Sequence, residues 1–169
     1  HEVCSESYEF QEKLNLACED IGLTTLSVGY DPFSNINKIP NNPKKRYKIM
    51  TKEMPKNGPL SLEMMYLTAG TQINIDYKNE EDFKKKFKVA SYLTPLSIAL
   101  FSNSAIKENK FSGYLSYRSN VWQKTSRAGL PEVFLDEMSF EKYADFVLDY
   151  PLLFLQKNNE YQFPGGKTY

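Results

Sequence analysis

The chain has 169 residues, a length that fits one domain with a core of its own. Its 21 basic side chains balance its 21 acidic ones, which excludes the excess positive charge typical of proteins that bind nucleic acids or anionic membranes. No apolar run approaches the ~20 residues that a membrane-spanning helix needs.

The first third of the chain is expected to contain two helices and one strand. Residues 6–21 carry apolar side chains at helical spacing before a glycine, which predicts an amphipathic helix. Residues 23–30 alternate in polarity and predict a strand, and the prolines of residues 31–43 predict an irregular loop. A short helix should begin at Lys44 and end at Pro55.

Residues 71–77, Thr-Gln-Ile-Asn-Ile-Asp-Tyr, alternate without interruption and predict a strand with two different faces. Gln72, Asn74 and Asp76 share one face. A row of amide and carboxylate groups suits a metal ion or a polar ligand. An ordinary solvated strand without a functional role explains the same pattern equally well.

Two consecutive helices should follow, at residues 79–93 and 95–101, with Thr94 as the cap of the second helix and a proline at its first position. Residues 111–119 alternate again and predict a strand that carries Arg118.

The last part of the chain should hold a helix from Ser139 to Tyr150 and a hairpin formed by residues 152–156 and 161–163. Helices and strands follow one another without regular βαβ spacing. We therefore predict an α+β domain built on a largely antiparallel sheet.

Cys4 and Cys18 lie on or beside the first predicted helix. At ~1.5 Å per helical residue they would be roughly 21 Å apart, which is too far for a disulfide. Free thiols are typical of reducing compartments, so a cytoplasmic location is expected. Cys18 is also explained as a small buried hydrophobe.

Several familiar catalytic sites are excluded by the sequence. His1 is the only histidine, so neither a Ser-His-Asp triad nor a histidine metal site can be built from these residues. The Gly-Lys-Thr at residues 166–168 lacks the earlier glycine and the following helix of a phosphate-binding loop.

Arginine is scarce, since Arg46, Arg118 and Arg127 stand against eighteen lysines. In a chain that uses lysine on its surface, arginine is favoured where its rigid bidentate fork is needed. One interpretation is that these arginines bind carboxylates. The other is that they form buried structural ion pairs.

Six motifs follow one another along nearly the whole chain. They are Pro-Lys-Lys-Arg-Tyr-Lys-Ile-Met at 43–50, Met-Pro-Lys at 54–56, Glu-Met-Met at 63–65, Thr-Gln-Ile-Asn-Ile-Asp at 71–76, Ala-Leu-Phe-Ser-Asn-Ser at 99–104 and Gly-Tyr-Leu-Ser-Tyr-Arg-Ser-Asn-Val-Trp at 113–122. In this order they resemble the plant and proteobacterial type of the glutamate–cysteine ligase family.

The resemblance implies a glutamine-synthetase-like fold, in which a curved antiparallel sheet with flanking helices holds the active site. It also implies ATP- and Mg²⁺-dependent joining of the L-glutamate γ-carboxylate to the amino group of L-cysteine through an acyl phosphate, the first step of glutathione biosynthesis. We expect residues 1–169 to be the central part of a single catalytic domain, truncated at both ends and inactive alone.

The family resemblance further implies roles for individual residues. Arg46 and Arg118 would hold substrate carboxylates, and Arg118 would also steady the acyl phosphate. Gln72 and Asn74 would face the metal ion and the γ-phosphate of ATP from the strand. Asn74 would also contact the substrate.

Three further side chains, Trp122, Tyr114 and Met65, would shape the amino-acid pocket. Arg127 would contact phosphate or act as a structural anchor. Cys4 occupies the place of a cysteine that plant members use in a redox disulfide.

Two departures from the family pattern leave alternatives open. Leu153 stands where the family usually has an aromatic residue, which puts the fit of the acceptor in question. The glutamate-rich strands that bind magnesium in the family would precede His1. A related γ-glutamyl ligase with another amine acceptor and a non-catalytic amino-acid-binding module are therefore the alternatives.

Overall fold

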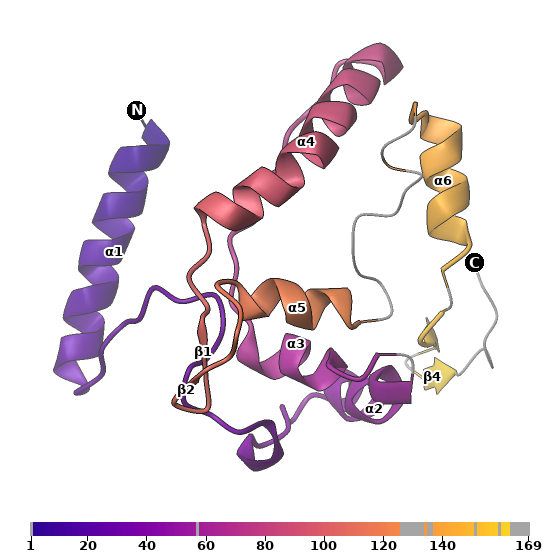
Figure 1. Ribbon diagram of the computed structural model, residues 1–169. Helices are drawn as coiled ribbons and strands as arrows, with labels where there is room; N and C mark the ends of the chain where they lie inside the picture. The colour runs from indigo at the N-terminus through magenta and orange to yellow at the C-terminus, as the bar shows by residue number, and fades with distance from the viewer. Residues whose placement is uncertain are drawn as a thin grey trace.

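The computed structural model describes residues 2–56, 58–125, 134, 137–150, 152–158 and 160–162. Within these ranges the protein is α+β, as predicted, with helices around two small antiparallel hairpins (Figure 1). The elements are α1 (Glu2–Asp20), η1 (Ile36–Lys38), α2 (Lys45–Glu53), η2 (Met54–Lys56), α3 (Ser61–Leu67), α4 (Glu80–Leu100), β1 (Ile106–Lys107), β2 (Lys110–Phe111), α5 (Tyr117–Gln123), α6 (Phe140–Leu148), β3 (Leu155–Lys157) and β4 (Glu160–Gln162). None of the helices in these ranges is long and apolar enough to cross a membrane.

Four predicted elements are confirmed with small shifts at their ends. Helix α1 begins earlier than expected, α2 ends just before Pro55, and β3 pairs with β4 as the expected hairpin. Ser139 caps α6, because its side chain accepts a hydrogen bond from the backbone N–H of Lys142 at 3.1 Å. Helix α3 lies in a segment whose pattern alone indicates no definite state.

Two of the predicted strands are wrong within the described residues. Residues 71–77 have no regular secondary structure and pair with no other described segment, and Ile73 is 82% exposed. Residues 23–30 make only one isolated bridge, between Tyr30 and Thr68. Alternation predicts which side chains share a face, but a strand also needs a partner for its backbone N–H and C=O groups.

The predicted strand at residues 111–119 is also wrong, since β2 ends at Phe111 and α5 begins at Tyr117. Gly113 turns the backbone with a φ of 84°. The hydroxyl of Ser116 then caps α5 by accepting from the N–H of Ser119. Arg118 therefore lies in the first turn of a helix.

The two helices expected between residues 79 and 101 form one helix, α4, which contains Pro95. Thr94 does not cap a new helix. Its hydroxyl donates to the carbonyl of Ala90 at 2.9 Å, one turn earlier in the same helix. The helix continues because a proline interrupts a single N–H bond, and a helix can survive that loss with a local bend.

The expected curved antiparallel sheet is not present in the described ranges, where the β-structure consists of the hairpins β1–β2 and β3–β4. The core lies instead between α3 and α5, which cross near the centre of Figure 1. Its buried side chains are Tyr30, Leu67, Tyr117 and Val121. These residues hold the segment around Tyr30 against both helices.

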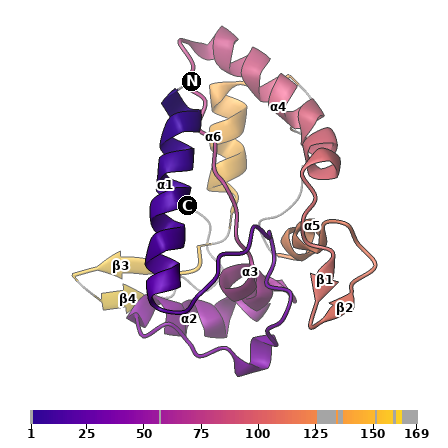
Figure 2. The ribbon, with the colours of Figure 1, turned by 90° about the vertical axis from the view of Figure 1, so that its left-hand side faces the viewer.

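Helices α1 and α4 lie at the periphery. Figure 1 shows α1 at one side of the molecule, and Figure 2, viewed from that side, shows it in front of the other elements. No residue of α1 is buried, although Phe10 and Ile21 belong to its predicted apolar stripe. The amino-terminal half of α4 contacts α6 through a set of aromatic rings that includes Phe83, Phe140 and Tyr143.

Candidate active site

Arg118 is held from two directions at the start of α5. Its backbone N–H donates to the hydroxyl of Ser104 at 3.2 Å, and its Nε donates to the carbonyl of Ala69 at 2.8 Å. The second bond crosses from α5 to the segment that follows α3. The guanidinium group is thereby fixed at one nitrogen, and its terminal nitrogens can serve a ligand.

Two glycines allow this arginine to lie so close to the backbone. A β-carbon at Gly70 would lie 2.6 Å from Nη2 of Arg118. At Gly29 it would lie 3.2 Å from Cδ of the same side chain and 2.8 Å from Oδ1 of Asn103. Neither glycine has a positive φ, so the close approach is the reason for the small residue.

A cavity of about 690 Å³ opens beside the guanidinium. It lies between residues 26–29, the segment after α3, the end of α4 and the start of α5. Its polar lining residues are Ser27, Thr71, Ser97, Asn103, Ser116, Arg118 and Ser119. Arg118 is the one charged side chain among the lining residues, and the serine, threonine and asparagine side chains can donate hydrogen bonds. The cavity therefore suits an anion with several oxygens.

Trp122 lies one helical turn after Arg118 in α5 and packs against its guanidinium. The guanidinium carbon is 5.5 Å from the centre of the indole ring, within the range of a cation–π contact. This stacking restricts the arginine further. The site therefore has a preorganised cation, which is the property that binding of a carboxylate or a phosphate needs.

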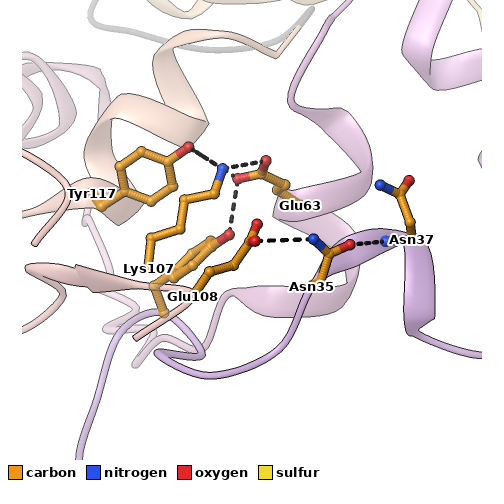
Figure 3. Close-up of polar contacts among 7 residues, drawn as sticks. Asn35, Asn37, Glu63, Lys107, Glu108 and Tyr117 are labelled. Carbon is orange, nitrogen blue, oxygen red and sulfur yellow. Dashed lines mark hydrogen bonds and ion pairs between the residues drawn. The ribbon is translucent and has the colours of Figure 1, made fainter. Parts of the chain in front are cut away.

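A second cluster lies behind the cavity, in the core. Glu63 of α3 is 7% exposed and accepts hydrogen bonds from the hydroxyls of Tyr30 at 2.9 Å and Tyr117 at 3.2 Å. The ammonium of Lys107 donates to Glu63 at 2.8 Å and to the hydroxyl of Tyr117 at 2.8 Å (Figure 3). The buried carboxylate is thus paired with a cation and fully surrounded by donors.

The surroundings shift the pKa values of three of these groups. Burial, the hydrogen bond to Glu63 and the charge of that carboxylate raise the pKa of Tyr30. Burial also raises the pKa of Tyr117, although Lys107 acts in the opposite direction. Burial opposes the protonated form of Lys107, but its hydrogen bonds to Glu63 and Tyr117 raise its pKa. All three groups therefore remain protonated at neutral pH.

Comparison with known families identifies the chain. The model of glutamate-cysteine ligase family 2 (GCS2) matches residues 1–164. The chain belongs to this family.

Curated relatives agree with this assignment. The chain is 40% identical over 164 residues to glutamate–cysteine ligase A, chloroplastic, of Oryza sativa subsp. japonica, which covers 95% of this chain and 33% of the relative. It is 40% identical to the chloroplastic enzyme of Nicotiana tabacum and 39% identical to that of Arabidopsis thaliana, in each case over 100% of this chain and 33% of the relative. The chain thus spans about a third of the length of the curated relatives that it matches.

The names of these relatives correct one prediction. The cytoplasmic location inferred from the free cysteines is wrong, because curated relatives that are 39–40% identical to the chain are named chloroplastic. Both cysteines are free, with Cys4 exposed and Cys18 half-buried. Free thiols are typical of reducing compartments, but they do not distinguish one reducing compartment from another.

The structure brings together only some of the residues to which the resemblance to glutamate–cysteine ligases gives roles. Arg118 lines the cavity, and Trp122 contacts its guanidinium without being among the residues that line the cavity. Tyr114 does not line it either, and its ring lies 6.1 Å from that of Tyr117. Met65 is half-buried on α3 and is not among the residues that line the cavity.

Other predicted site residues lie elsewhere. Arg46 is on α2, where its guanidinium lies 5.1 Å from the ring centre of Tyr47, and it does not line the cavity. Gln72 and Asn74 are exposed and do not line it either. Thr71 and Ile73, from the opposite side of the alternating segment, do. Arg127 lies outside the described residues.

Sequence reasoning did not find the polar core cluster or the contribution of Asn103. Glu63 is the one acid within α3, between apolar neighbours, and this was the available signal. An acid at such a position must have partners if it is buried. Its partners are 33 to 54 residues away in sequence, so no local pattern identifies them.

Metal-binding residues are not gathered in the described part of the chain. Among those residues there is no group of three or more histidine, cysteine, aspartate or glutamate side chains that could hold a metal ion. Gln72, the predicted metal ligand, is exposed and could supply one oxygen of the six that Mg²⁺ requires. The described donor set does not fit a magnesium site.

Proposed function

We propose that the chain forms the Arg118 side of an active site that joins the γ-carboxylate of L-glutamate to the amino group of L-cysteine at the expense of ATP, the first step of glutathione biosynthesis. Membership of glutamate-cysteine ligase family 2 supports this proposal. The observation that carries it at the level of the site is a guanidinium group fixed beside a cavity lined with hydrogen-bond donors.

The chemistry explains why such a cation is needed. A carboxylate and an amine do not condense at neutral pH, because the carboxylate is a poor electrophile. Transfer of the ATP γ-phosphoryl group to the glutamate carboxylate gives an acyl phosphate, which the amine of cysteine attacks with release of phosphate. Arg118 would bind the carboxylate and then stabilise the negative charge that develops on the phosphoryl oxygens.

The remaining predicted roles form part of the same proposal. Trp122 and Tyr114 would shape the amino-acid pocket together with Met65. Arg46 would hold a second carboxylate. For Gln72 and Asn74 to face the cavity, residues 71–77 would have to shift by one residue, which exchanges the two faces of the alternating segment. Such a shift breaks no strand pairing, because the segment has no strand partner among the described residues.

The proposal extends to the fold and the cofactor. The family suggests a glutamine-synthetase-like fold of which this chain would be the central part, and the chloroplastic relatives suggest a plastid location. ATP would be used together with Mg²⁺, which neutralises phosphate charge when bound. The described residues do not bring together the side chains that would bind the metal.

Phosphate release from ATP in the complete protein that carries this chain tests the proposal. Release that requires both glutamate and cysteine supports it. Release with glutamate and another amine would assign the chain to a related γ-glutamyl ligase. Binding of glutamate without release would make it a non-catalytic binding module.

Arg118→Lys is the matched test of the site. Lysine keeps the positive charge but loses the bidentate fork and the Nε bond to Ala69, so turnover should fall by about 100-fold or more. Lys88→Arg, an exposed change on α4, should leave phosphate release unchanged. Near-normal turnover of Arg118→Lys would remove Arg118 from the site.

A further inference from the structure

The polar cluster in the core is connected to Arg118 through the helix that carries it. Tyr117 directly precedes Arg118 in α5, and its hydroxyl hydrogen-bonds to Lys107 and Glu63 (Figure 3). Helix α5 has seven residues, so it is too short to be stable alone. Its orientation must therefore come from tertiary contacts such as these.

The same carboxylate also reaches the other side of the arginine site. Tyr30 donates to Glu63, and its backbone forms a bridge with Thr68. Next to this bridge, the N–H of Ala69 donates to the carbonyl of Gly29 at 3.1 Å. The carbonyl of Ala69 is the acceptor for Nε of Arg118. Glu63 is thus linked to both ends of the bond that fixes the guanidinium. One path runs through Tyr117, the neighbour of Arg118, and the other through Tyr30 and Thr68, the neighbour of Ala69.

The charges of the cluster are matched. Lys107 lies on the β1–β2 hairpin and supplies the cation that the buried carboxylate needs. The hydroxyl of Tyr117 accepts from Lys107 and donates to Glu63, so its hydrogen-bonding capacity is used in one fixed orientation. Loss of one member would leave the others with unsatisfied groups and a different spacing.

We propose that Glu63, paired with Lys107, is a positioning residue that sets the orientation of α5 through Tyr117 and so places the guanidinium of Arg118 in the cavity. This inference rests on the proposed ligase function for its kinetic consequence, but its structural part can be tested without activity. Glu63 does not line the cavity, so its effect would pass through Arg118.

Tyr117→Phe is the sharpest variant, because it removes one hydroxyl and keeps the ring that packs edge-on against Tyr30 at 4.9 Å. Its matched control is Tyr66→Phe. Tyr66 is a residue of α3, and its hydroxyl, like that of Tyr117, hydrogen-bonds to two side chains, Thr51 and Asn41. These hydrogen bonds do not reach Arg118. Both changes remove the same atom from a hydrogen-bonded tyrosine.

Trp122 provides a readout that does not depend on turnover. It is the only tryptophan in the 169-residue chain, and it stacks on Arg118. If α5 is reoriented, the guanidinium should move off the indole and acrylamide should quench Trp122 fluorescence more strongly in Tyr117→Phe. Tyr66→Phe should show the quenching of the unmodified chain.

The kinetic readout is the KM for glutamate in the complete protein. Tyr117→Phe should raise this KM by about tenfold with a smaller change in kcat, since binding of the carboxylate is what a displaced guanidinium loses first. Should the variant not fold, Lys107→Met, which keeps the apolar stem, must give the same two changes.

The outcomes separate the two proposals. Stronger quenching in a protein that releases no phosphate would reject the ligase function and keep the positioning role. A protein that releases phosphate, but in which Tyr117→Phe equals Tyr66→Phe in quenching and in KM, would overturn the positioning role. The positioning role would also be overturned if Tyr117→Phe and Tyr66→Phe lowered the melting temperature equally and quenching of Trp122 fluorescence did not differ between them. A merely structural role predicts that result.

Discussion

The region around α3 and α5 and the pair of peripheral helices α1 and α4 are both rich in apolar residues, but they differ in burial. Val121 of α5 is completely buried, and Leu67 of α3 is 4% exposed. In contrast, α1 has no buried residue and α4 has one, Ser91. Phe101, directly after α4, is 79% exposed.

The difference shows what an apolar stripe does and does not specify. Periodic apolar residues predict a helix and the face that it would bury, and α1 and α4 are indeed helical. Burial depends on a partner surface, which the stripe itself does not supply. Around α3 and α5 the partner is present, because the segment at Tyr30 and the β1–β2 hairpin pack against both helices.

The largest expected effect compares the same substitution in the two regions. Val121→Asp places a carboxylate in the core without a partner and should cost at least about 3 kcal/mol of the free energy of unfolding. Val89→Asp, at a side chain of α4 that is 57% exposed, should change it by no more than about 0.5 kcal/mol. Urea denaturation followed by circular dichroism measures both, and similar losses would contradict the comparison.

An intermediate effect is expected from Tyr30→Phe, which keeps the buried ring and removes its hydrogen bond to Glu63. At neutral pH the free energy of unfolding should fall by about 1–2 kcal/mol, because the bond joins a charged acceptor. The folded protein raises the pKa of Tyr30 above its unfolded value. This stabilisation is therefore complete below about pH 10 and is lost as the pH rises further.

The pH dependence supplies the check for this variant. Above about pH 10 the unmodified chain should lose stability more steeply than Tyr30→Phe, by up to about 1.4 kcal/mol per pH unit. Tyr30→Phe should still lose some stability at alkaline pH, because the pKa values of Tyr117 and Lys107 are also raised in the folded protein. Identical alkaline slopes for the two proteins would show that Tyr30 is not linked to folding in this way.

The smallest effect on stability should come from Gly70→Ala, which sharpens the description of the site. The new methyl group would meet the end of the Arg118 side chain, which can move, so the free energy of unfolding should change by about 0.5 kcal/mol or less. The displaced guanidinium should raise the KM for glutamate by about tenfold, equivalent to about 1.4 kcal/mol. An unchanged KM would show that the substrate does not require this position of the arginine.

Particular residues show how far the sequence alone could lead. Ser139 was recognisable as a helix cap, because capping depends on the N–H groups two and three residues later. Arg118 was selected as a site candidate on its chemistry and lines the cavity, but it was placed on a strand. The sequence around Ser116 is compatible with two structures. Its alternating pattern favours a strand, whereas the Ser116 hydroxyl can cap a helix, and the local sequence does not show which structure forms.

For residues 71–77, the sequence predicted two faces but not which face lies toward the cavity. Their alternation is perfect in sequence, and yet Thr71 and Ile73 line the cavity while Gln72 and Asn74 do not. Without a paired neighbour, nothing in the segment itself fixes which face turns inward. The roles predicted for Gln72 and Asn74 therefore stay predictions.

By itself, the amino-acid sequence determined the helical periods, the cap at Ser139, the scarcity of arginine and the motifs of the family, since each of these depends on neighbours in the chain or on residue type. Only the tertiary structure decided that Glu63, Lys107 and Tyr117 meet in the core and that Ala69 and Trp122 hold Arg118. These contacts join segments as far apart as 54 residues, and their energies depend on distance and burial, which the order of residues does not encode locally.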